Sequence, residues 1–250
     1  MGPAIANTHR FFVDATTFAN ATTTDANLLH QWSRVLRLRI DQTLLLLDGT
    51  GLAAVVRITE LTPKRASWQV VESFVATGEP RLQVTLAVAL IRADRFEWVL
   101  QKATEIGVCT IVPIIAERSM SDGDVSPSKR ERWQRIIREA AEQSCRGIVP
   151  HLAPAVTVIE MPVPAEAQVF WCYEGAGTRP LRQFPCDPAR PVWLLSGPEG
   201  SFSPNELAWF AQQPLWHAAG LGARILRAET APLVAATMLL ALAGDFDGEG

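Results

Sequence analysis

The chain has 250 residues, of which 48% are hydrophobic and 20% are charged. This balance is that of an ordinary globular protein, so it excludes a chain that is disordered throughout and predicts a substantial core. The formal net charge of -3 excludes a strongly basic protein, so binding of nucleic acid would depend on a local patch of arginine and lysine.

Cysteine spacing and hydropathy exclude several further classes. The four cysteines are far apart and form no C-x-x-C pair, so neither a zinc site nor a disulfide framework is expected. No basic segment followed by an apolar run opens the chain. The most apolar stretch, 231–243, is shorter than the roughly 20 residues that a membrane helix needs. We therefore expect a cytoplasmic protein with no membrane span and no bound metal, in which 231–243 is a buried helix.

The first part of the chain has a mainly β pattern. Strands are expected at 10–13, 44–47, 55–61 and 68–75. A helix is expected at 27–35, with Asp25 available as its N-terminal cap. Gly78, Glu79 and Pro80 then interrupt the pattern. We place a domain boundary there, which gives domains 1–78 and 79–250.

Beyond this boundary strands alternate with helices, which is typical of an α/β fold with a largely parallel sheet. Strands are expected at 82–90, 110–115, 169–173, 192–196 and 215–218. Asp94 and Glu97 predict a capping box for a helix that ends at Gly107. Ser128 and Glu131 predict a second box. A proline-rich connection, 150–164, follows the second helix.

One glycine motif, at 49–54, fits the nucleotide-binding pattern G-x-G-x-x-A. That pattern must open a helix, but the residues after it, 55–59, keep a β pattern. Asp48 and Gly49 therefore favour the turn of a β-hairpin.

A second glycine motif follows the strand expected at 192–196, where Gly197-Pro198-Glu199-Gly200 leads into a helix. Ser203 as N-cap, Pro204 at the first position and Glu206 predict the start of that helix. The two glycines would let backbone approach a ligand closely, although a plain strand-to-helix turn explains the loop equally well.

A third segment, LGARILRAETA at 221–231, places two arginines, Glu229 and Thr230 among apolar residues before the apolar helix. The segment could simply be an exposed loop in which Glu229 interacts with the helix dipole. That interpretation explains Glu229, but it does not explain why so many other polar residues lie in the segment.

Together these segments resemble the ribosomal RNA small subunit methyltransferase E family of the SPOUT superfamily, which methylates N3 of a uridine in 16S ribosomal RNA. The resemblance covers nearly the whole chain. It is carried by HRFFV at 9–13, HQWSRVLRL at 30–38, RFEWVLQKATEIGV at 95–108, ERS at 117–119, RWQRIIREAAEQSCR at 132–146 and the two segments above. One departure is Ser201, where the family usually has glycine.

The resemblance implies an N-terminal PUA-like β-barrel, a SPOUT α/β domain with a trefoil knot, a homodimer, and S-adenosylmethionine held by two loops. On this sequence the cofactor-binding residues would be Leu195, Ser196, Gly197, Pro198, Glu199 and Gly200, together with Leu221, Gly222, Ile225, Leu226, Thr230 and Ala231. The partner would be 16S ribosomal RNA within the small subunit. The alternatives are a SPOUT enzyme acting on another RNA and a non-catalytic RNA-binding relative.

Arginines and one carboxylate are the candidate catalytic residues. The negative charge that develops on uracil would be stabilised by Arg10, Arg224 and Arg227. Glu229 would be the base, although an interaction with the dipole of the helix that follows explains this residue equally well. Candidate RNA contacts are Arg10, Arg34, Arg37, Arg39, Arg138 and Arg146. Arg34, Arg37 and Arg39 are preferred as phosphate contacts. In the second basic group, Arg135 and Arg138 each have a glutamate four residues later, which favours a solvated helix face. The arginines at 34–39 could instead pack their stems against the barrel.

Overall fold

A computed structural model describes residues 8–119, 125–175, 178–185 and 187–247. The chain forms two compact units. The first comprises Met1–Glu79 and Ala141–Val149, and the second comprises Pro80–Ala140 and Pro150–Gly250. The chain therefore crosses between the units three times, after Glu79, after Ala140 and after Val149.

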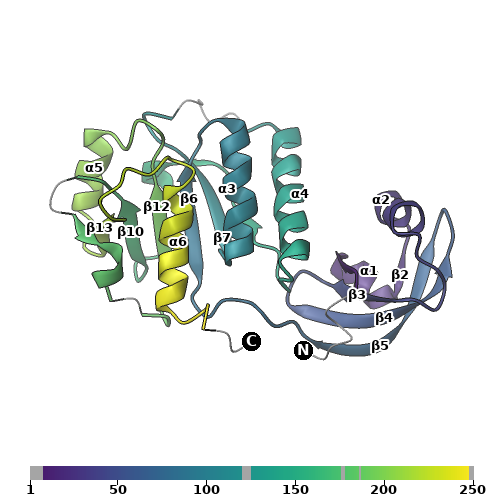
Figure 1. Cartoon of the computed structure of the whole chain (residues 1–250). Coiled ribbons are helices and arrows are strands. Elements are labelled where there is room, and N and C mark those ends of the chain that lie inside the picture. The colour runs from purple at the N-terminus through teal and green to yellow at the C-terminus, as the bar shows by residue number, and fades with distance from the viewer. Residues whose placement is uncertain (1–7, 120–124, 176–177, 186, 248–250) are drawn as a thin grey trace. The chain divides into compact units, whose positions relative to one another are not determined.

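The first unit is built on a five-stranded mixed sheet in the order β1-β3-β4-β5-β2 (Figure 1). Its strands are β1 (Arg10–Phe12), β2 (Thr22–Thr23), β3 (Thr43–Leu47), β4 (Leu52–Leu61) and β5 (Ala66–Val75). Only β1 and β3 are paired in parallel. The hairpin predicted at Asp48 and Gly49 is confirmed. Asp48 accepts hydrogen bonds from the backbone N–H groups of Thr50 and Leu52, and Gly49 has a φ of 79° that favours glycine.

The first unit also contains two short helices, α1 (Ala15–Asn20) and α2 (Ala26–His30). Asp25 caps α2 as predicted, because its carboxylate accepts from the N–H groups of Asn27 and Leu28. Beyond α2 the chain continues as a π-helical turn, Gln31–Val35. Trp32 in this turn is fully buried, with its ring 5.5 Å from that of Phe11 and 6.0 Å from that of Trp68. The short α1 and β2 were not predicted, since neither has an apolar periodicity.

The second unit confirms the α/β prediction. Its strand order is β11-β13-β10-β12-β6-β7-β8, and every pair in it is parallel. The strands are β6 (Val84–Ala89), β7 (Thr110–Ile115), β8 (His151–Leu152), β9 (Val156–Thr157), β10 (Gln168–Cys172), β11 (Arg179–Pro180), β12 (Val192–Ser196) and β13 (Trp216–Gly220). Strand β12, buried at all five positions, lies between β10 and β6.

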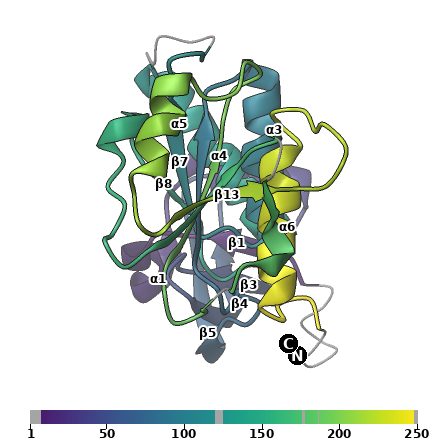
Figure 2. The ribbon, with the colours of Figure 1, turned by 90° about the vertical axis from the view of Figure 1, so that its left-hand side faces the viewer.

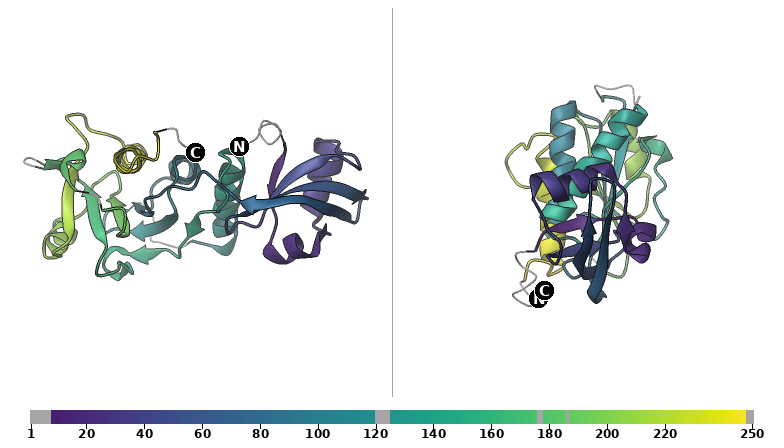
Figure 3. Two further views of the ribbon diagram at one scale, coloured as in Figure 1. Left: turned by 90° about the horizontal axis from the view of Figure 1, so that it is seen from below. Right: turned by 90° about the vertical axis from the view of Figure 1, so that its right-hand side faces the viewer.

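Helices cover both faces of this sheet. They are α3 (Ala93–Ile106), α4 (Pro127–Gln143), α5 (Pro204–Ala211) and α6 (Ala231–Leu242). Helices α3 and α6 lie side by side on one face, and α5 lies on the other (Figures 2 and 3). Helix α6 buries most of its apolar side chains within the chain, as expected for 231–243.

Helix starts in this unit were predicted with mixed success. The Asp94–Glu97 box is wrong, because α3 begins at Ala93 with no side-chain cap and Glu97 instead pairs with Arg132 at 2.6 Å. The Ser128–Glu131 box is wrong too, since the hydroxyl that accepts from Lys129 N–H is that of Ser126, two residues before Ser128. The end of α3 at Gly107 is confirmed by its left-handed φ of 116°.

Within the described residues, no helix is both long and apolar enough to cross a membrane. The same residues bring no three His, Cys, Asp or Glu side chains together as metal ligands.

Candidate functional site

A cavity of about 320 Å³ lies at the carboxyl ends of β10, β12 and β6, between the segments that follow them and the segment that follows β13. Ligands of parallel α/β sheets typically bind at this edge. Of the predicted cofactor residues, this cavity is lined by Ser196, Gly197, Pro198, Glu199, Ile225, Leu226 and Ala231. Residues 197–203 are called the first loop below, and 221–230 the second loop.

A smaller cavity of about 50 Å³ shares part of this lining. It is lined by the predicted Leu221 and Gly222, together with Arg224. Leu195, Gly200 and Thr230 line neither cavity, and Leu195 is fully buried in β12. The pattern therefore located both loops but not every residue that faces the space between them.

Ser201 and Ala228, in the two loops, line the larger cavity but were not among the predicted site residues. Three further residues of the lining, outside both loops, were also missed by the sequence analysis: Arg95, Cys172 and Glu174. Arg95 comes from α3, and the other two come from the end of β10 and the turn after it. The sequence around Arg95 carries no glycine, and Gly175 and Gly177 after Glu174 were not singled out by the sequence analysis. Only the order of strands in the sheet brings them beside the two loops.

The geometry of the first loop explains its sequence. The Ser201 N–H donates to the Pro198 carbonyl at 2.9 Å, and Ser201 has a φ of 59°. This left-handed conformation favours glycine over serine. The predicted capping box of Ser203 and Glu206 then starts α5, with both of its hydrogen bonds formed.

The two glycines of the first loop have a reason other than close approach to a ligand. A Cβ atom at Gly197 would lie 3.2 Å from the ring of Phe202, which is buried. A Cβ atom at Gly200 would lie 3.4 Å from the Arg118 side chain. The loop therefore packs against its own chain at both positions, and Gly197→Val would disturb Phe202 as well as any ligand.

Glu206 connects the first loop to the segment after β7. One of its carboxylate oxygens accepts from Ser203 N–H at 2.7 Å, and the other accepts from Glu117 N–H at 2.9 Å. Beside it, Arg118 donates to the Gly200 carbonyl at 2.8 Å. The ERS segment at 117–119 thus holds the first loop in place.

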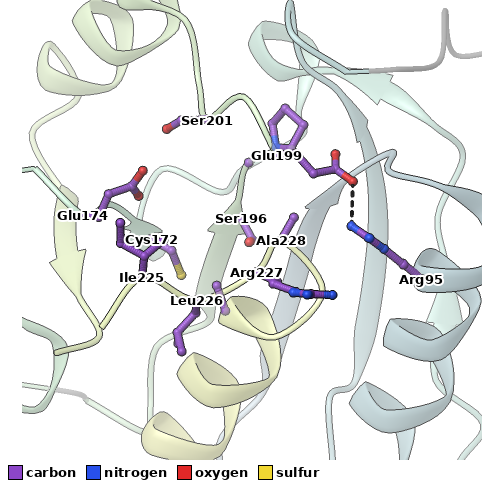
Figure 4. Close-up of a pocket in the computed structure, with 13 residues that line it drawn as sticks. Arg95, Cys172, Glu174, Ser196, Glu199, Ser201, Ile225, Leu226, Arg227 and Ala228 are labelled. Carbon is purple, nitrogen blue, oxygen red and sulfur yellow. Dashed lines mark hydrogen bonds and ion pairs between the residues drawn. The ribbon is translucent and has the colours of Figure 1, made fainter. Parts of the chain in front are cut away.

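Arg95 links the two loops through charge. Its Nη1 lies 3.4 Å from Glu199 Oε1 in the first loop, the contact drawn in Figure 4, and 3.7 Å from Glu229 Oε2 in the second. Arg227 Nη1 lies 3.9 Å from Glu229 Oε1. The Glu229 side chain is only 12% exposed, and its Oε2 has no hydrogen-bond donor in the described part of the chain. The negative charge of Glu229 is therefore stabilised by the positive charges of Arg95 and Arg227.

Cys172 lies in the lining as a neutral thiol. Burial, together with a smaller contribution from the negative charge of Glu174, raises the pKa of this thiol to about 12. A thiol with this pKa is protonated at neutral pH, so Cys172 is not a nucleophile.

The candidate catalytic arginines are not all at the cavity. Arg227 lines the larger cavity with a side chain that is 76% exposed, and Arg224 lines the smaller one. Arg10 belongs to the first unit, where its guanidinium contacts the Cys145 sulfur. Within the second unit, the arginines at the larger cavity are therefore Arg95 and Arg227.

Similarity to known proteins agrees with this site. A family model of the RNA methyltransferase domain matches residues 78–240. The ribosomal RNA small subunit methyltransferase E of Synechocystis sp. is 35% identical over 229 residues, covering 90% of this chain and 74% of the relative. The Bacillus subtilis protein of the same name is 29% identical, with coverage of 83% and 84%. The chain belongs to the ribosomal RNA small subunit methyltransferase E family.

Solved structures of similar proteins extend this result to the fold. The family member from Neisseria gonorrhoeae, bound to S-adenosylmethionine, has a TM-score of 0.84 and 30% identity, covering 94% of this chain and 98% of that one. A protein from Legionella pneumophila in complex with the same cofactor has a TM-score of 0.82 and 25% identity, with the same coverage. The α/β architecture is therefore shared with these methyltransferases.

The structure also separates the candidate RNA contacts of this ribosomal RNA methyltransferase. Arg34, Arg37 and Arg39, called the arginine segment below, are all exposed next to the π-helical turn. Arg37 has a left-handed φ of 54°. The burial of Trp32 fixes the start of this segment in the core, while its arginines face solvent.

Arg146 has a different role from the one predicted. Its side chain is only 3% exposed, and its Nη2 donates to Glu79 Oε2 at 2.6 Å. Glu79 also accepts from the N–H groups of Gly147 and Ile148. This buried ion pair joins two segments of the first unit, so we do not carry Arg146 forward as a phosphate contact. Arg138 is exposed on α4.

Proposed function

We propose that the protein transfers a methyl group from S-adenosylmethionine to N3 of a specific uridine in 16S ribosomal RNA of the small subunit. The observation that carries this proposal is the cavity between the first and second loops. It lies in a chain whose fold matches, at a TM-score of 0.84, that of a family member bound to this cofactor. The family name supports small-subunit ribosomal RNA as the substrate.

The residues at the cavity fit this cofactor. When bound, S-adenosylmethionine supplies an electrophilic methyl group on a positively charged sulfur. The cavity offers apolar surface from Ile225, Leu226 and Ala231, and polar backbone from the first loop. Most small-molecule sites combine an apolar lining with a few polar groups in this way. We assign the cofactor to both loops, with the twelve residues predicted above as its surroundings.

The acceptor nitrogen requires help from the chain, because N3 of uracil carries a proton that must leave. We assign the stabilisation of the developing negative charge to Arg227, whose exposed guanidinium is at the cavity. Glu229 is the candidate proton acceptor, held beside Arg95 and Arg227. N3 lies on the pairing edge, so the uridine must be unpaired or flipped out.

Finer features of fold and assembly belong to the same proposal. We assign 1–78 to a PUA-like β-barrel that binds RNA through the arginine segment and Arg10, and 79–250 to a SPOUT domain with a trefoil knot. The mixed five-stranded sheet and the parallel sheet support these assignments. The family resemblance supports a homodimer, and Leu242, half exposed at the end of α6, is available to an interface. A ribosomal RNA substrate supports a cytoplasmic location for the enzyme.

Methyl transfer in vitro tests the proposal. Purified protein, labelled S-adenosylmethionine and small-subunit particles or naked 16S RNA are combined, in the presence of a metal chelator. Labelled N3-methyluridine should form, and its formation should persist in the chelator. Absence of label from both substrates, with a folded protein that fails to bind the cofactor by calorimetry, would contradict the proposed function.

A further inference from the structure

Glu174 occupies a central position at the edge of the sheet that carries the site. It follows β10, which is paired with β12 on one side and with β13 on the other. The first loop follows β12 and the second loop follows β13. Glu174 therefore lies between the two cofactor loops, and it lines both cavities.

The charges around the larger cavity are unevenly compensated. Glu199 has Arg95 as its ionic partner, and Glu229 has both Arg95 and Arg227. Glu174, in contrast, forms no hydrogen bond or ion pair with any residue that the structure describes. Arg95 comes from the helix after β6, on the far side of β12 from β10, and Figure 4 shows its guanidinium directed at Glu199.

The electrostatic effect of Glu174 is visible in its surroundings. Its negative charge contributes to the raised pKa of the Cys172 thiol at the end of β10, although burial is the larger cause. Glu174 is exposed in the chain alone, so its carboxylate is open to a ligand, and a cation bound in the cavity would interact favourably with this unpaired negative charge. S-adenosylmethionine provides two positive groups, the sulfonium and the α-ammonium.

We infer that Glu174 pairs with a positively charged group of the cofactor and so determines specificity for it. This inference rests on the proposed function, because it takes S-adenosylmethionine to be the ligand of the cavity. The shared chemistry is a cation, and the sulfonium and the ammonium are its two possible sources. Only the sulfonium is lost when the methyl group leaves, so the product, S-adenosylhomocysteine, distinguishes them.

The experiment compares cofactor affinity by calorimetry in wild type, Glu174→Gln and Glu174→Asp. A charge-assisted contact is worth about 1.5 kcal/mol or more, so Glu174→Gln should weaken S-adenosylmethionine binding at least about tenfold. Glu174→Asp keeps the charge and should retain most of the affinity. Glu166→Gln is the matched control, because exposed Glu166 precedes β10 at the opposite end of the same strand and should bind as wild type.

Affinity for S-adenosylhomocysteine then assigns the source. If Glu174→Gln leaves product affinity unchanged, the partner is the sulfonium, and if product affinity falls equally, the partner is the ammonium. Melting temperatures should match in all variants, since Glu174 forms no hydrogen bond or ion pair within the described chain.

Wild-type affinity for S-adenosylmethionine in a folded Glu174→Gln protein would overturn the inference. It would show that Glu174 at most accepts a hydrogen bond that glutamine also accepts, as from a ribose hydroxyl. Equal losses in the Gln and Asp variants would overturn it as well. Failure of the wild-type protein to bind S-adenosylmethionine would instead contradict the proposed function.

Discussion

Replacing Glu206 tests whether one buried carboxylate holds the first loop. Its side chain is 5% exposed and accepts two backbone N–H donors, from Ser203 at 2.7 Å and Glu117 at 2.9 Å. Each hydrogen bond to a charged group contributes about 1.5–3 kcal/mol. Glu206→Gln keeps one acceptor and turns an amide toward the other donor, so it should cost about 1.5–3 kcal/mol. Glu206→Ala loses both bonds and should cost about twice as much.

Chemical denaturation and thermal melting measure this effect. For a chain of this size, about 1 kcal/mol corresponds to a fall in Tm of about 2–4 °C. Cofactor affinity should fall in parallel, because Glu206 holds the end of the first loop. The control is Glu117→Gln, which changes an exposed side chain but leaves the Glu117 N–H in place. A Glu206→Gln protein with the stability of wild type would refute the reasoning.

Three further predictions concern other parts of the site. Ser201→Gly relieves a left-handed serine conformation that costs about 1–2 kcal/mol, but glycine adds about 0.5–1 kcal/mol of conformational entropy to the unfolded chain. The denaturation midpoint should therefore stay the same or rise. A lower midpoint would show that the serine side chain contributes stability. Arg95→Ala should lower cofactor affinity about tenfold, because Arg95 pairs with both loops. The control, Arg92→Ala, breaks the exposed ion pair with Asp94 and should leave cofactor affinity unchanged. Equal cofactor affinities in the two variants would exclude Arg95 as a link between the loops. Replacing the three arginines of the arginine segment with glutamate should weaken RNA binding and flatten its salt dependence, while melting temperature and cofactor affinity stay unchanged. A folded variant with wild-type RNA affinity would show that the RNA contacts lie elsewhere, for example on α4.

Local patterns predicted the elements of the second unit well. Apolar runs identified the long strands, and Ser203, Pro204 and Glu206 correctly predicted the start of α5. The Asp94–Glu97 box failed although it had the same spacing, because Glu97 forms an ion pair with Arg132 from another helix. A capping pattern cannot show which distant side chain will compete for its carboxylate.

The site was predictable only where its residues form a contiguous motif. The two loops were found from their glycines and polar residues, and the family resemblance gave them a ligand. Arg95 and Glu174 were missed because they reach the cavity through strand order, which places β10 and β6 on either side of β12. Arg146 was predicted as a phosphate contact, because its burial against Glu79, 67 residues away in the sequence, depends on the fold.

Mass spectrometry of nucleosides from 16S ribosomal RNA tests the central claim most directly. RNA from a strain that lacks this protein is compared with RNA from the same strain carrying the wild-type gene or the Glu174→Gln variant. N3-methyluridine should be lost in the deletion strain, return with the wild-type gene, and return less completely with the variant. N3-methyluridine at the wild-type level in the deletion strain would contradict it.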